Sequence, residues 1–387
     1  MRFNNMCIIC DGYPIETNES NTFVKQLVLA LSDLGIICSV IAPCSIASKI
    51  INKKELGPKF AIENTQTGKE MYIYRPRYIS FSSNKLFGLN TFILTEFFFS
   101  KAVKRVFKKL NNKSDVIYAH FLAPAGLVAS TIGIEYKIPT FYANGESKVR
   151  ILDYFRNSRI ERLLNYFSGV ISVSTYNKQD LVNQKLINED KIVILPNGID
   201  NNLFYTRNKE EVRKELGFNS TDFIVAFVGH FSDRKGSERL SKALDLIPSV
   251  KSIFIGSGGK PPTCKGQLFC GKLPHYEVPK YLNTADVFVL PTFAEGCCNA
   301  IIEAMACGLP IISSDLSFND DILTKENSIR IDVNDVQAIK NAIILLRDNS
   351  ELRVRMSDAA VISASNLNIK KRASNIIEFI DSKISTK

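Results

Sequence analysis

The sequence predicts an α/β protein built from two doubly wound parallel sheets. Short apolar runs alternate with segments of helical spacing along nearly the whole chain, which is the pattern of strands joined by crossover helices. Twelve such runs occur, and twelve strands are too many for one sheet of this kind. A loop-forming stretch at 196–204 separates them into two sets of six, so we expect two domains.

The expected strands are short continuous apolar runs, which are typical of strands buried on both faces. In the first half they are 6–10, 36–42, 116–119, 139–143, 169–173 and 191–195. In the second half they are 223–229, 252–256, 267–270, 286–290, 309–313 and 328–332. The predicted domains are 1–200 and 201–365, followed by a C-terminal helix in 366–387 that is apolar at helical spacing.

Composition limits the class of protein. With 387 residues, of which 45% are apolar, the chain can bury the cores of two domains. Its nine cysteines are an odd number and lie mostly in apolar context, so we expect no disulfide framework and a reducing, cytoplasmic location. Cys7 and Cys10 would point to opposite faces of a strand and the three histidines are scattered, so no metal site is expected.

Two further properties concern partners. No run of about 18 apolar residues occurs, and the N-terminus is typical of a first strand, so neither a transmembrane helix nor a signal peptide is expected. The net charge of +10 indicates anionic partners. Diphosphate substrates and an anionic membrane surface explain it, whereas nucleic acid is not expected because no recognition motif is present.

The stretch EGCCNAIIEAMACGLP holds two carboxylates, Glu295 and Glu303, separated by seven residues at a strand-to-helix junction. Glu295 follows a predicted strand, at the carboxyl end where open α/β sheets bind ligands, and Glu303 lies inside the next helix. Backbone N–H groups near Cys298 and Ala300, at the helix start, favour a diphosphate. One carboxylate can bind sugar hydroxyls and the other ribose hydroxyls, so the motif indicates sugar-nucleotide chemistry.

Positive charge is predicted at the same end of the sheet. Departure of a nucleoside diphosphate needs its charge stabilised more than it needs a strong base. Arg234 and Lys235 lie in the loop after the predicted strand 223–229, from which they can reach this edge. The alternative is that both are solvated loop cations.

The stretch 295–310 resembles the E-x7-E signature of the retaining glycosyltransferases of family 4, which have the GT-B fold of two Rossmann-like domains facing a central cleft. Segments 168–182, 193–200, 227–236 and 275–292 follow the family's order and approximate spacing. A lone pair of glutamates would be a weak signal, but this ordered set is specific.

The resemblance implies a donor site in the C-terminal domain. It assigns catalytic roles in glycosyl transfer to Glu295 and Lys235. His230 stands where the family usually has Arg, so Arg234 is interpreted as the same positive charge at a different position. Asn299 matches an Asn in a common family variant, and Gly271 to Leu273 are expected to contact the base of the nucleotide. Because the chain has no convincing D-x-D sequence to hold a divalent metal, we expect a metal-independent reaction without a cofactor.

The acceptor is expected in the N-terminal domain. His120 follows a predicted strand and matches a family His, with an acceptor contact or a structural cap as alternatives. Asn144 replaces another family His, and Glu146 is expected to supply a carboxylate nearby. The family also implies that the helix in 366–387 packs back on this domain.

These observations predict a retaining glycosyltransferase that moves a hexose or N-acetylhexosamine from a nucleoside diphosphate sugar, UDP in preference to GDP, to a membrane-associated glycan acceptor in surface polysaccharide assembly. One alternative is an enzyme that makes a small soluble glycoconjugate. Another is a non-catalytic sugar-nucleotide-binding subunit, which the changes at His230 and Asn144 make conceivable.

The segment 92–110 is predicted to be a basic amphipathic helix that could lie on an anionic bilayer. The alternative is a surface helix whose stripe docks on the core, with Phe97 and Phe98 off the stripe and available to a membrane. The stripe comprises Phe92, Phe99, Val103, Val106 and Leu110, and the basic residues are Lys101, Lys104, Arg105, Lys108 and Lys109.

Overall fold

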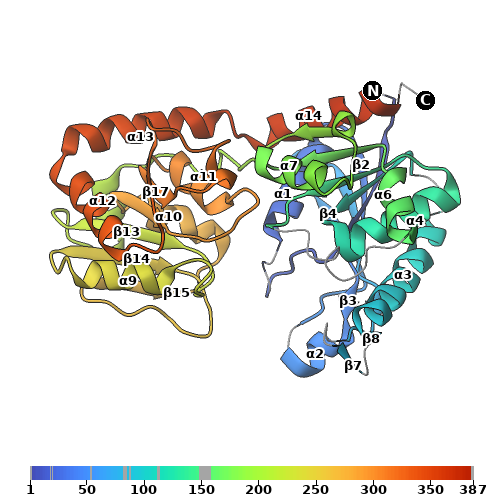
Figure 1. The fold of residues 1–387 in the computed structure, drawn as a ribbon, viewed down its shortest axis with the longest axis horizontal. Helices are drawn as coiled ribbons and strands as arrows, with labels where there is room; N and C mark the ends of the chain where they lie inside the picture. Colours follow the sequence, from blue (N-terminus) through green and yellow to red (C-terminus); the bar gives the residue numbers. More distant parts are fainter. Residues whose placement is uncertain are drawn as a thin grey trace. The chain divides into compact units, whose positions relative to one another are not determined.

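The computed structural model describes residues 2–17, 19, 21–52, 55–81, 85–86, 89–110, 114–147 and 158–384. The chain forms two compact units, one comprising the chain up to Leu195 together with the segment from Arg372 onward, and the other Pro196–Lys371 (Figure 1). All twelve predicted strands are present, six in each unit, and each unit has the expected parallel-sheet α/β architecture.

The first unit contains an eight-stranded sheet in the order β12-β11-β10-β9-β1-β2-β5-β4. Its strands run parallel except for β4, which pairs antiparallel with β5. The chain winds outward in both directions from β1, as in a doubly wound sheet. The strands are β1 (Asn5–Cys10), β2 (Ile37–Ile41), β4 (Phe60–Asn64), β5 (Glu70–Tyr74), β9 (Val116–His120), β10 (Thr140–Asn144), β11 (Gly169–Ser172) and β12 (Ile192–Ile194).

The β4–β5 hairpin was not predicted from the sequence. Its strands lie at the sheet edge, and β4 alternates between half-buried and exposed residues, so it lacks a continuous apolar run. Two small ribbons accompany the main sheet, formed by β3 (Cys44–Ser45) with β6 (Arg77–Tyr78), and by β7 (Lys85–Leu86) with β8 (Leu89–Asn90).

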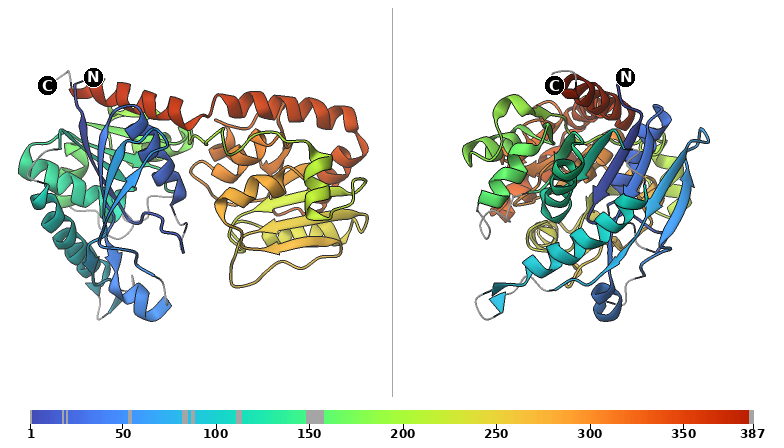
Figure 2. Two further views of the ribbon diagram at one scale, coloured as in Figure 1. Left: turned by 180° about the vertical axis from the view of Figure 1, so that it is seen from behind. Right: turned by 90° about the vertical axis from the view of Figure 1, so that its right-hand side faces the viewer.

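Helices cover both faces of the first sheet, since β1 is buried from Met6 to Cys10 (Figure 2). Apolar side chains of α3, α4 and α6 pack on Cys7 and Ile9 of β1 in one core. The helical segments are α1 (Thr22–Asp33), α2 (Ile46–Asn52), α3 (Phe92–Lys109), the π-helical turn η1 (Leu122–Gly126), α4 (Leu127–Tyr136), α6 (Ser158–Tyr166), α7 (Thr175–Asn183), η2 (Glu189–Lys191) and α14 (Ile369–Ile384).

Helix α14 belongs to the first unit from Arg372 onward. It buries Ala373, Ile376 and Ile380, and its Phe379 ring packs edge-on against Phe141 of β10 with 6.1 Å between centroids. Gly169 of β11 makes room for it, because a Cβ there would lie 2.7 Å from the Phe379 ring. The last helix is therefore an integral layer of the unit that contains the N-terminal strand.

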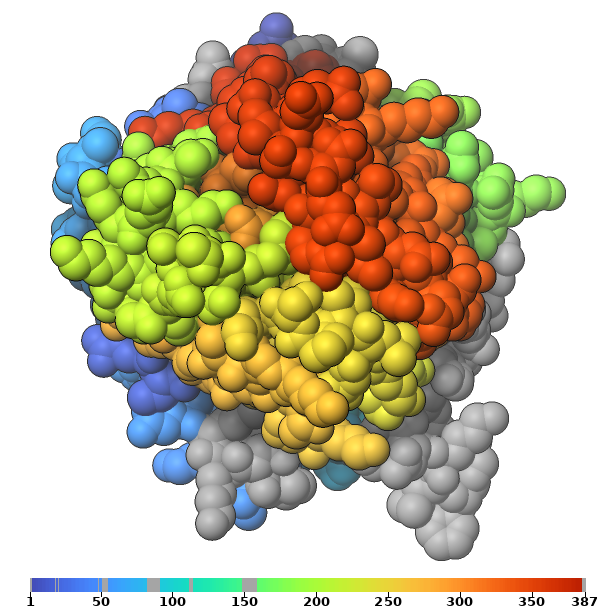
Figure 3. All heavy atoms as spheres, turned by 90° about the vertical axis from the view of Figure 1, so that its left-hand side faces the viewer, coloured from blue at the N-terminus to red at the C-terminus, as the bar shows by residue number. Residues whose placement is uncertain are grey.

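The second unit has a six-stranded parallel sheet in the order β15-β14-β13-β16-β17-β18. The strands are β13 (Phe223–Val228), β14 (Val250–Ile255), β15 (Gln267–Gly271), β16 (Val287–Leu290), β17 (Ile311–Ser314) and β18 (Ser328–Ile331). The helical segments are α8 (Lys209–Leu216), α9 (Ser237–Asp245), η3 (His275–Glu277), α10 (Val278–Leu282), α11 (Asn299–Ala306), η4 (Ser317–Asn319), α12 (Val336–Asp348) and α13 (Ser350–Ser365). Figure 3 views this unit from outside, with α12 and α13 in orange-red.

A buried ion pair fixes the start of β16 in this unit. Asp286 Oδ2 accepts hydrogen bonds from Arg213 Nη2 and from the backbone N–H of Ile224, both at 2.8 Å. Lys209 Nζ lies 2.8 Å from the other carboxylate oxygen. The side chains of Arg213 and Asp286 are only 4% and 11% exposed, so the pair links α8 and β13 to β16 with little solvent screening.

Replacing Asp286 by Ala should therefore destabilise the second unit by about 3–5 kcal/mol, since it leaves the Arg213 guanidinium buried without its partner. Urea unfolding followed by circular dichroism measures this loss. The matched control is Asp348→Ala, because Asp348 pairs with Arg347 but is 58% exposed, and there the change should stay within about 0.5 kcal/mol. Equal effects of the two substitutions would contradict the structural role of Asp286.

Candidate functional site

The junction of β16 and α11 carries the paired carboxylates. Strand β16 is fully buried and α11 begins at Asn299, with Ala300 as its second residue. Cys298 is the N-cap residue in an extended conformation, and its side chain makes no capping hydrogen bond. The Cys298 side chain therefore does not cap the first helical turn, and N–H groups at a helix start can bind an anion.

Glu295 lies in the loop between these elements and is the centre of a converging cluster. Glu295 as a whole is 9% exposed. Lys235 Nζ lies 2.6 Å and Arg234 Nη1 3.3 Å from Glu295 Oε1, and the Thr292 hydroxyl donates to the same oxygen at 2.7 Å. The structure thus brings together the predicted Glu295, Lys235 and Arg234. Thr292 was not singled out from the sequence, because nothing in its local pattern distinguishes it from a strand-terminal Thr.

Lys235 is charged in this surrounding. Burial opposes the ammonium form, but the Cys298 sulfur, which carries charge only when it ionises at high pH, and the charge and hydrogen bond of Glu295 together outweigh burial and raise the pKa of Lys235 above its usual value. Burial raises the pKa of the Cys298 thiol to about 11, so this thiol is neutral at physiological pH. Lys235 is the less exposed of the two loop cations, at 13% against 46% for Arg234.

The loop after β13 that carries these cations lies tightly against the end of β16. Gly236 has φ +77°, and a Cβ there would lie 2.3 Å from the Pro291 carbonyl oxygen, so only glycine fits. Arg239 of α9 donates to the same carbonyl at 2.8 Å, and its guanidinium lies 3.9 Å from the centroid of the Phe293 ring. Neither Arg239 nor Phe293 was predicted as part of this region, because their contact joins separate elements.

Glu303 is held by a histidine that the sequence did not single out. Glu303 lies in α11 and is 7% exposed. His275 Nε2 lies 2.9 Å from Glu303 Oε1, and the imidazole packs against the Phe204 ring with 5.2 Å between centroids. His275 is the first residue of η3, which follows the loop after β15. The two signature carboxylates thus each face a basic side chain.

The remaining predicted donor residues lie around this edge of the sheet. Asn299 Oδ1 accepts from Asn197 Nδ2 at 2.8 Å, and the same Asn197 group donates to the Cys297 carbonyl at 3.1 Å. Gly271 ends β15, and its carbonyl accepts from Gly256 N at 2.8 Å. Leu273 is half-buried and packs on the core of the second unit.

In the first unit, the predicted residues lie at the carboxyl ends of neighbouring strands. His120 ends β9, in register with Cys10 of β1 and Ala143 of β10. It is 4% exposed, and its ring lies between Phe23 and Phe121, at 5.0 and 4.8 Å. Burial, with a contribution from Arg372, lowers the pKa of His120 to about 3, so the imidazole is neutral.

Glu146 follows β10 and is a carboxyl group held mainly by backbone. One oxygen accepts from the Leu122 N–H, while Oε2 is buried with no hydrogen-bond partner among the described residues. Burial raises the pKa of Glu146 to about 7. Asp11, directly after β1, accepts from the Ala125 N–H; the surrounding protein and the charge of Glu146 raise the pKa of Asp11 well above its usual value, although its side chain keeps solvent contact.

Asn144 is fully buried and is bound within the unit. Its side-chain amide donates to the Asn177 carbonyl at 3.2 Å, and Asn177 Nδ2 lies 3.4 Å from its oxygen. Asn177 Nδ2 also donates to the Glu146 carbonyl at 2.6 Å. The observed contacts of Asn144 therefore position the loop that carries Glu146. Asp11 was not predicted, because its proximity to Glu146 depends on the sheet order.

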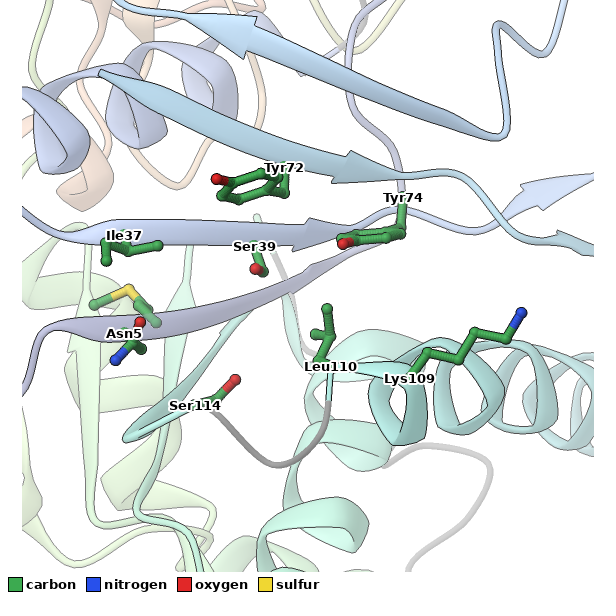
Figure 4. Close-up of a pocket in the computed structure, with 9 residues that line it drawn as sticks. Asn5, Ile37, Ser39, Tyr72, Tyr74, Lys109, Leu110 and Ser114 are labelled. Atoms are coloured by element: carbon green, nitrogen blue, oxygen red, sulfur yellow. The ribbon is translucent and has the colours of Figure 1, made fainter.

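A separate cavity of about 390 Å³ lies on the first unit, against the starts of β1 and β2 (Figure 4). None of the predicted site residues lines it; the lining residues are Asn5, Met6, Ile37, Ser39, Tyr72, Tyr74, Lys109, Leu110 and Ser114. Within the described ranges, no group of three or more His, Cys, Asp or Glu side chains is arranged to hold a metal ion.

Comparison with known proteins matches both halves of the chain to family models. Residues 208–363 match the model for glycosyl transferases group 1, and residues 20–203 match the model for glycosyltransferase family 4. The chain is 29% identical over 336 residues, 83% of either chain, to the Bacillus subtilis (strain 168) glycosyltransferase TuaC, which is named for teichuronic acid biosynthesis.

Two further similarities concern activity and fold. The chain is 26% identical over 227 residues, covering 54% of it and 58% of the relative, to the Escherichia coli UDP-Gal:α-D-GlcNAc-diphosphoundecaprenol α-1,3-galactosyltransferase. The sucrose-phosphate synthase of Thermosynechococcus elongatus has a similar structure, with a TM-score of 0.79 over 99% of this chain and 100% of that one at 19% identity.

The raised pKa of Glu146 makes the stability of the first unit pH-dependent. Because its folded pKa, about 7, lies above the unfolded 4.5, Glu146 contributes stability below pH 4.5 that is lost as the pH rises through 7. Glu146→Gln cannot ionise and so does not lose this stability. The melting temperature of the variant minus that of wild type should therefore grow as the pH rises from 5 to 8. Calorimetry measures the difference, with Glu135→Gln, whose side chain is 42% exposed, as the control. A pH-independent difference would contradict the buried carboxyl.

Proposed function

The chain belongs to the family 4 glycosyltransferases of the GT-B fold, and we propose that it moves a hexose or N-acetylhexosamine, with retention, from a UDP-sugar to a membrane-associated glycan acceptor in surface polysaccharide assembly. The observation that carries the proposal is the cluster in which Lys235 and Arg234 converge on Glu295 at the start of α11. Each group in it has a task in sugar-nucleotide transfer.

The donor diphosphate needs positive charge at its oxygens as the bond to the sugar breaks. Lys235, Arg234 and the N–H groups at the start of α11 supply it. Glu295 binds hydroxyls of the transferred sugar, and Glu303 binds the ribose. Because the leaving charge is met by two side-chain cations and a helix start, the proposed reaction requires no divalent metal.

Retention follows if the acceptor hydroxyl attacks on the face from which the diphosphate leaves. A phosphate oxygen of the leaving group then takes the proton of the acceptor hydroxyl, and the C1–O bond to the diphosphate breaks as the new C1–O bond forms. No protein nucleophile is needed in this scheme. Lys235 stabilises the phosphate while its charge increases, which is an interaction strongest in the transition state.

Relatives support the choice of donor and acceptor. The Escherichia coli protein is named for a UDP-Gal donor and a diphosphoundecaprenol-linked acceptor, and the Bacillus subtilis protein for teichuronic acid biosynthesis. In the first unit, Glu146 and Asp11 have raised pKa values, so their carboxyl groups can both donate to and accept from acceptor hydroxyls. Neutral His120 ends β9, which lies between β1 and β10, the strands that precede Asp11 and Glu146.

Helix α3 supports membrane association. Two residues of its stripe, Phe99 and Val103, are fully buried and the other three are half-buried, as the docking alternative predicts, and Phe107 is buried beside them. The opposite surface exposes Ile93, Leu94 and Phe97 beside basic residues. No helix in the described part of the chain is long and apolar enough to cross a membrane. We therefore propose peripheral binding at the inner face of the cytoplasmic membrane, with these apolar residues inserted at the interface.

Glu295→Ala should lower turnover by roughly 10² to 10³ while nucleotide affinity changes little, because this carboxylate contacts the sugar and is used in the transition state. The measurement is transfer from UDP-sugars to an undecaprenyl-diphosphate glycan with EDTA present, together with calorimetry of UDP. Asp233→Ala is the control, since its side chain lies in the same loop as Lys235 but is 88% exposed. Turnover of the Glu295 variant within threefold of wild type would refute the assignment, and loss of wild-type activity in EDTA that magnesium restores would refute metal independence.

Replacing Ile93, Leu94 and Phe97 together by Ser should abolish binding to anionic vesicles while transfer to a water-soluble acceptor persists. Fully burying one large apolar side chain contributes about 1.5–3 kcal/mol, so the loss of three removes most of the insertion energy. Vesicle co-sedimentation measures binding. The control replaces Val354 and Ile362 of α13, which are 58% and 66% exposed. Wild-type protein that stays in solution even at low salt would show the membrane proposal to be wrong.

A further inference from the structure

We propose that His275 is a positioning residue for the donor ribose: it holds one oxygen of Glu303 so that the other receives a ribose hydroxyl. This rests on the proposed role of Glu303 in donor binding. The contact itself is direct, with His275 Nε2 at 2.9 Å from Glu303 Oε1.

The surroundings fix the imidazole. His275 begins η3, directly after Pro274 at φ −57° and ψ 144°. One side of the ring packs on Phe204, which is 1% exposed and belongs to the core of the second unit. The His275 side chain retains 23% exposure, against 9% for Glu303. The imidazole therefore lies between the core and the carboxylate, with its freedom of rotation restricted by packing.

Glu303 depends on this contact. A carboxylate as buried as this one requires hydrogen bonds to replace the water it has lost. Among the described residues, the hydrogen bond from His275 is the one that the Glu303 side chain receives, and it engages Oε1. The Oε2 atom makes no hydrogen bond within the same set, and it is absent from the buried polar atoms that lack a partner. Oε1 of Glu303 is thus occupied by His275, and Oε2 is available to a ligand.

A fixed carboxylate makes a selective contact. When one oxygen is held, the carboxylate cannot rotate to compensate for a missing ligand group, so a nucleotide without the matching hydroxyl leaves Oε2 unpaired. With His275 removed, Glu303 is free to turn toward solvent and should contact the ribose weakly. His275 therefore determines discrimination between ribose and deoxyribose without touching the nucleotide.

The test is calorimetric titration of the full chain with UDP, 2′-deoxy-UDP and 3′-deoxy-UDP. His275→Ala should weaken UDP about tenfold and leave at least one deoxy analogue nearly unchanged, which reduces the wild-type preference for ribose. His275→Gln keeps a donor near the Nε2 position and should restore most of the affinity. The double variant with Glu303→Ala should bind UDP no more weakly than Glu303→Ala alone, because the two residues act as one unit.

The control is Glu277→Ala. Glu277 lies in the same turn, and its side chain makes no hydrogen bond or ion pair with any described residue, so UDP affinity should not change. In turnover assays, His275→Ala should raise the KM for the UDP-sugar and leave kcat within threefold. All variants are compared by melting temperature to confirm folding.

Several outcomes overturn the inference: unchanged UDP affinity in His275→Ala, equal weakening of ribose and deoxyribose nucleotides, additive losses in the double variant, or wild type that binds no UDP. The failure of the proposed function looks different. Wild type that binds UDP with a His275-dependent preference for ribose but transfers no sugar would leave the positioning role intact and remove the transferase.

Discussion

The buried carboxylate of Glu295, compensated by Lys235, is the interaction on which the candidate donor site depends. A carboxylate with this little exposure is stable as an anion only if cations and hydrogen-bond donors replace water, and Lys235 Nζ at 2.6 Å does most of this. The pair in turn requires the loop after β13 to approach the end of β16, which only glycine at position 236 allows. The ion pair thus depends on the backbone conformation of both loops.

Glu303 in the next helix is also a buried carboxylate that depends on a neighbouring side chain. The partner of its carboxylate is His275 rather than a lysine. An imidazole has no permanent positive charge, so this contact orients the carboxylate more than it neutralises it. Glu295 is surrounded by groups that suit a diphosphate and a sugar, whereas Glu303 has one donor and a free oxygen. The two halves of the signature are therefore chemically different, although the sequence presents them as a matched pair.

The fold could be predicted from the sequence because buried parallel strands are continuous apolar runs. The exceptions are the edge strand β4 and its neighbour β5, in which buried or half-buried residues alternate with more exposed ones, so neither forms a continuous apolar run. The convergence of Lys235 and Glu295 was predictable because both follow strands whose carboxyl ends meet at one edge. His275 and Asp11 were not, because their partners are set by how turns pack across the sheet rather than by any local spacing.

The two units offer different electrostatic surroundings to a ligand. In the second unit, the two cations Lys235 and Arg234 lie at the single carboxylate of Glu295, so this cluster can take additional negative charge, as a nucleoside diphosphate brings. In the first unit, burial raises the pKa of Glu146, whose carboxyl group accepts from the Leu122 N–H, and burial together with the charge of Glu146 raises the pKa of Asp11. These carboxyl groups suit neutral hydroxyls, to which they can both donate and accept, and they supply no positive charge for a diphosphate. The division between an anionic donor and a hydroxyl-bearing acceptor, which the proposed transfer requires, is therefore consistent with the charge balance of each unit taken alone.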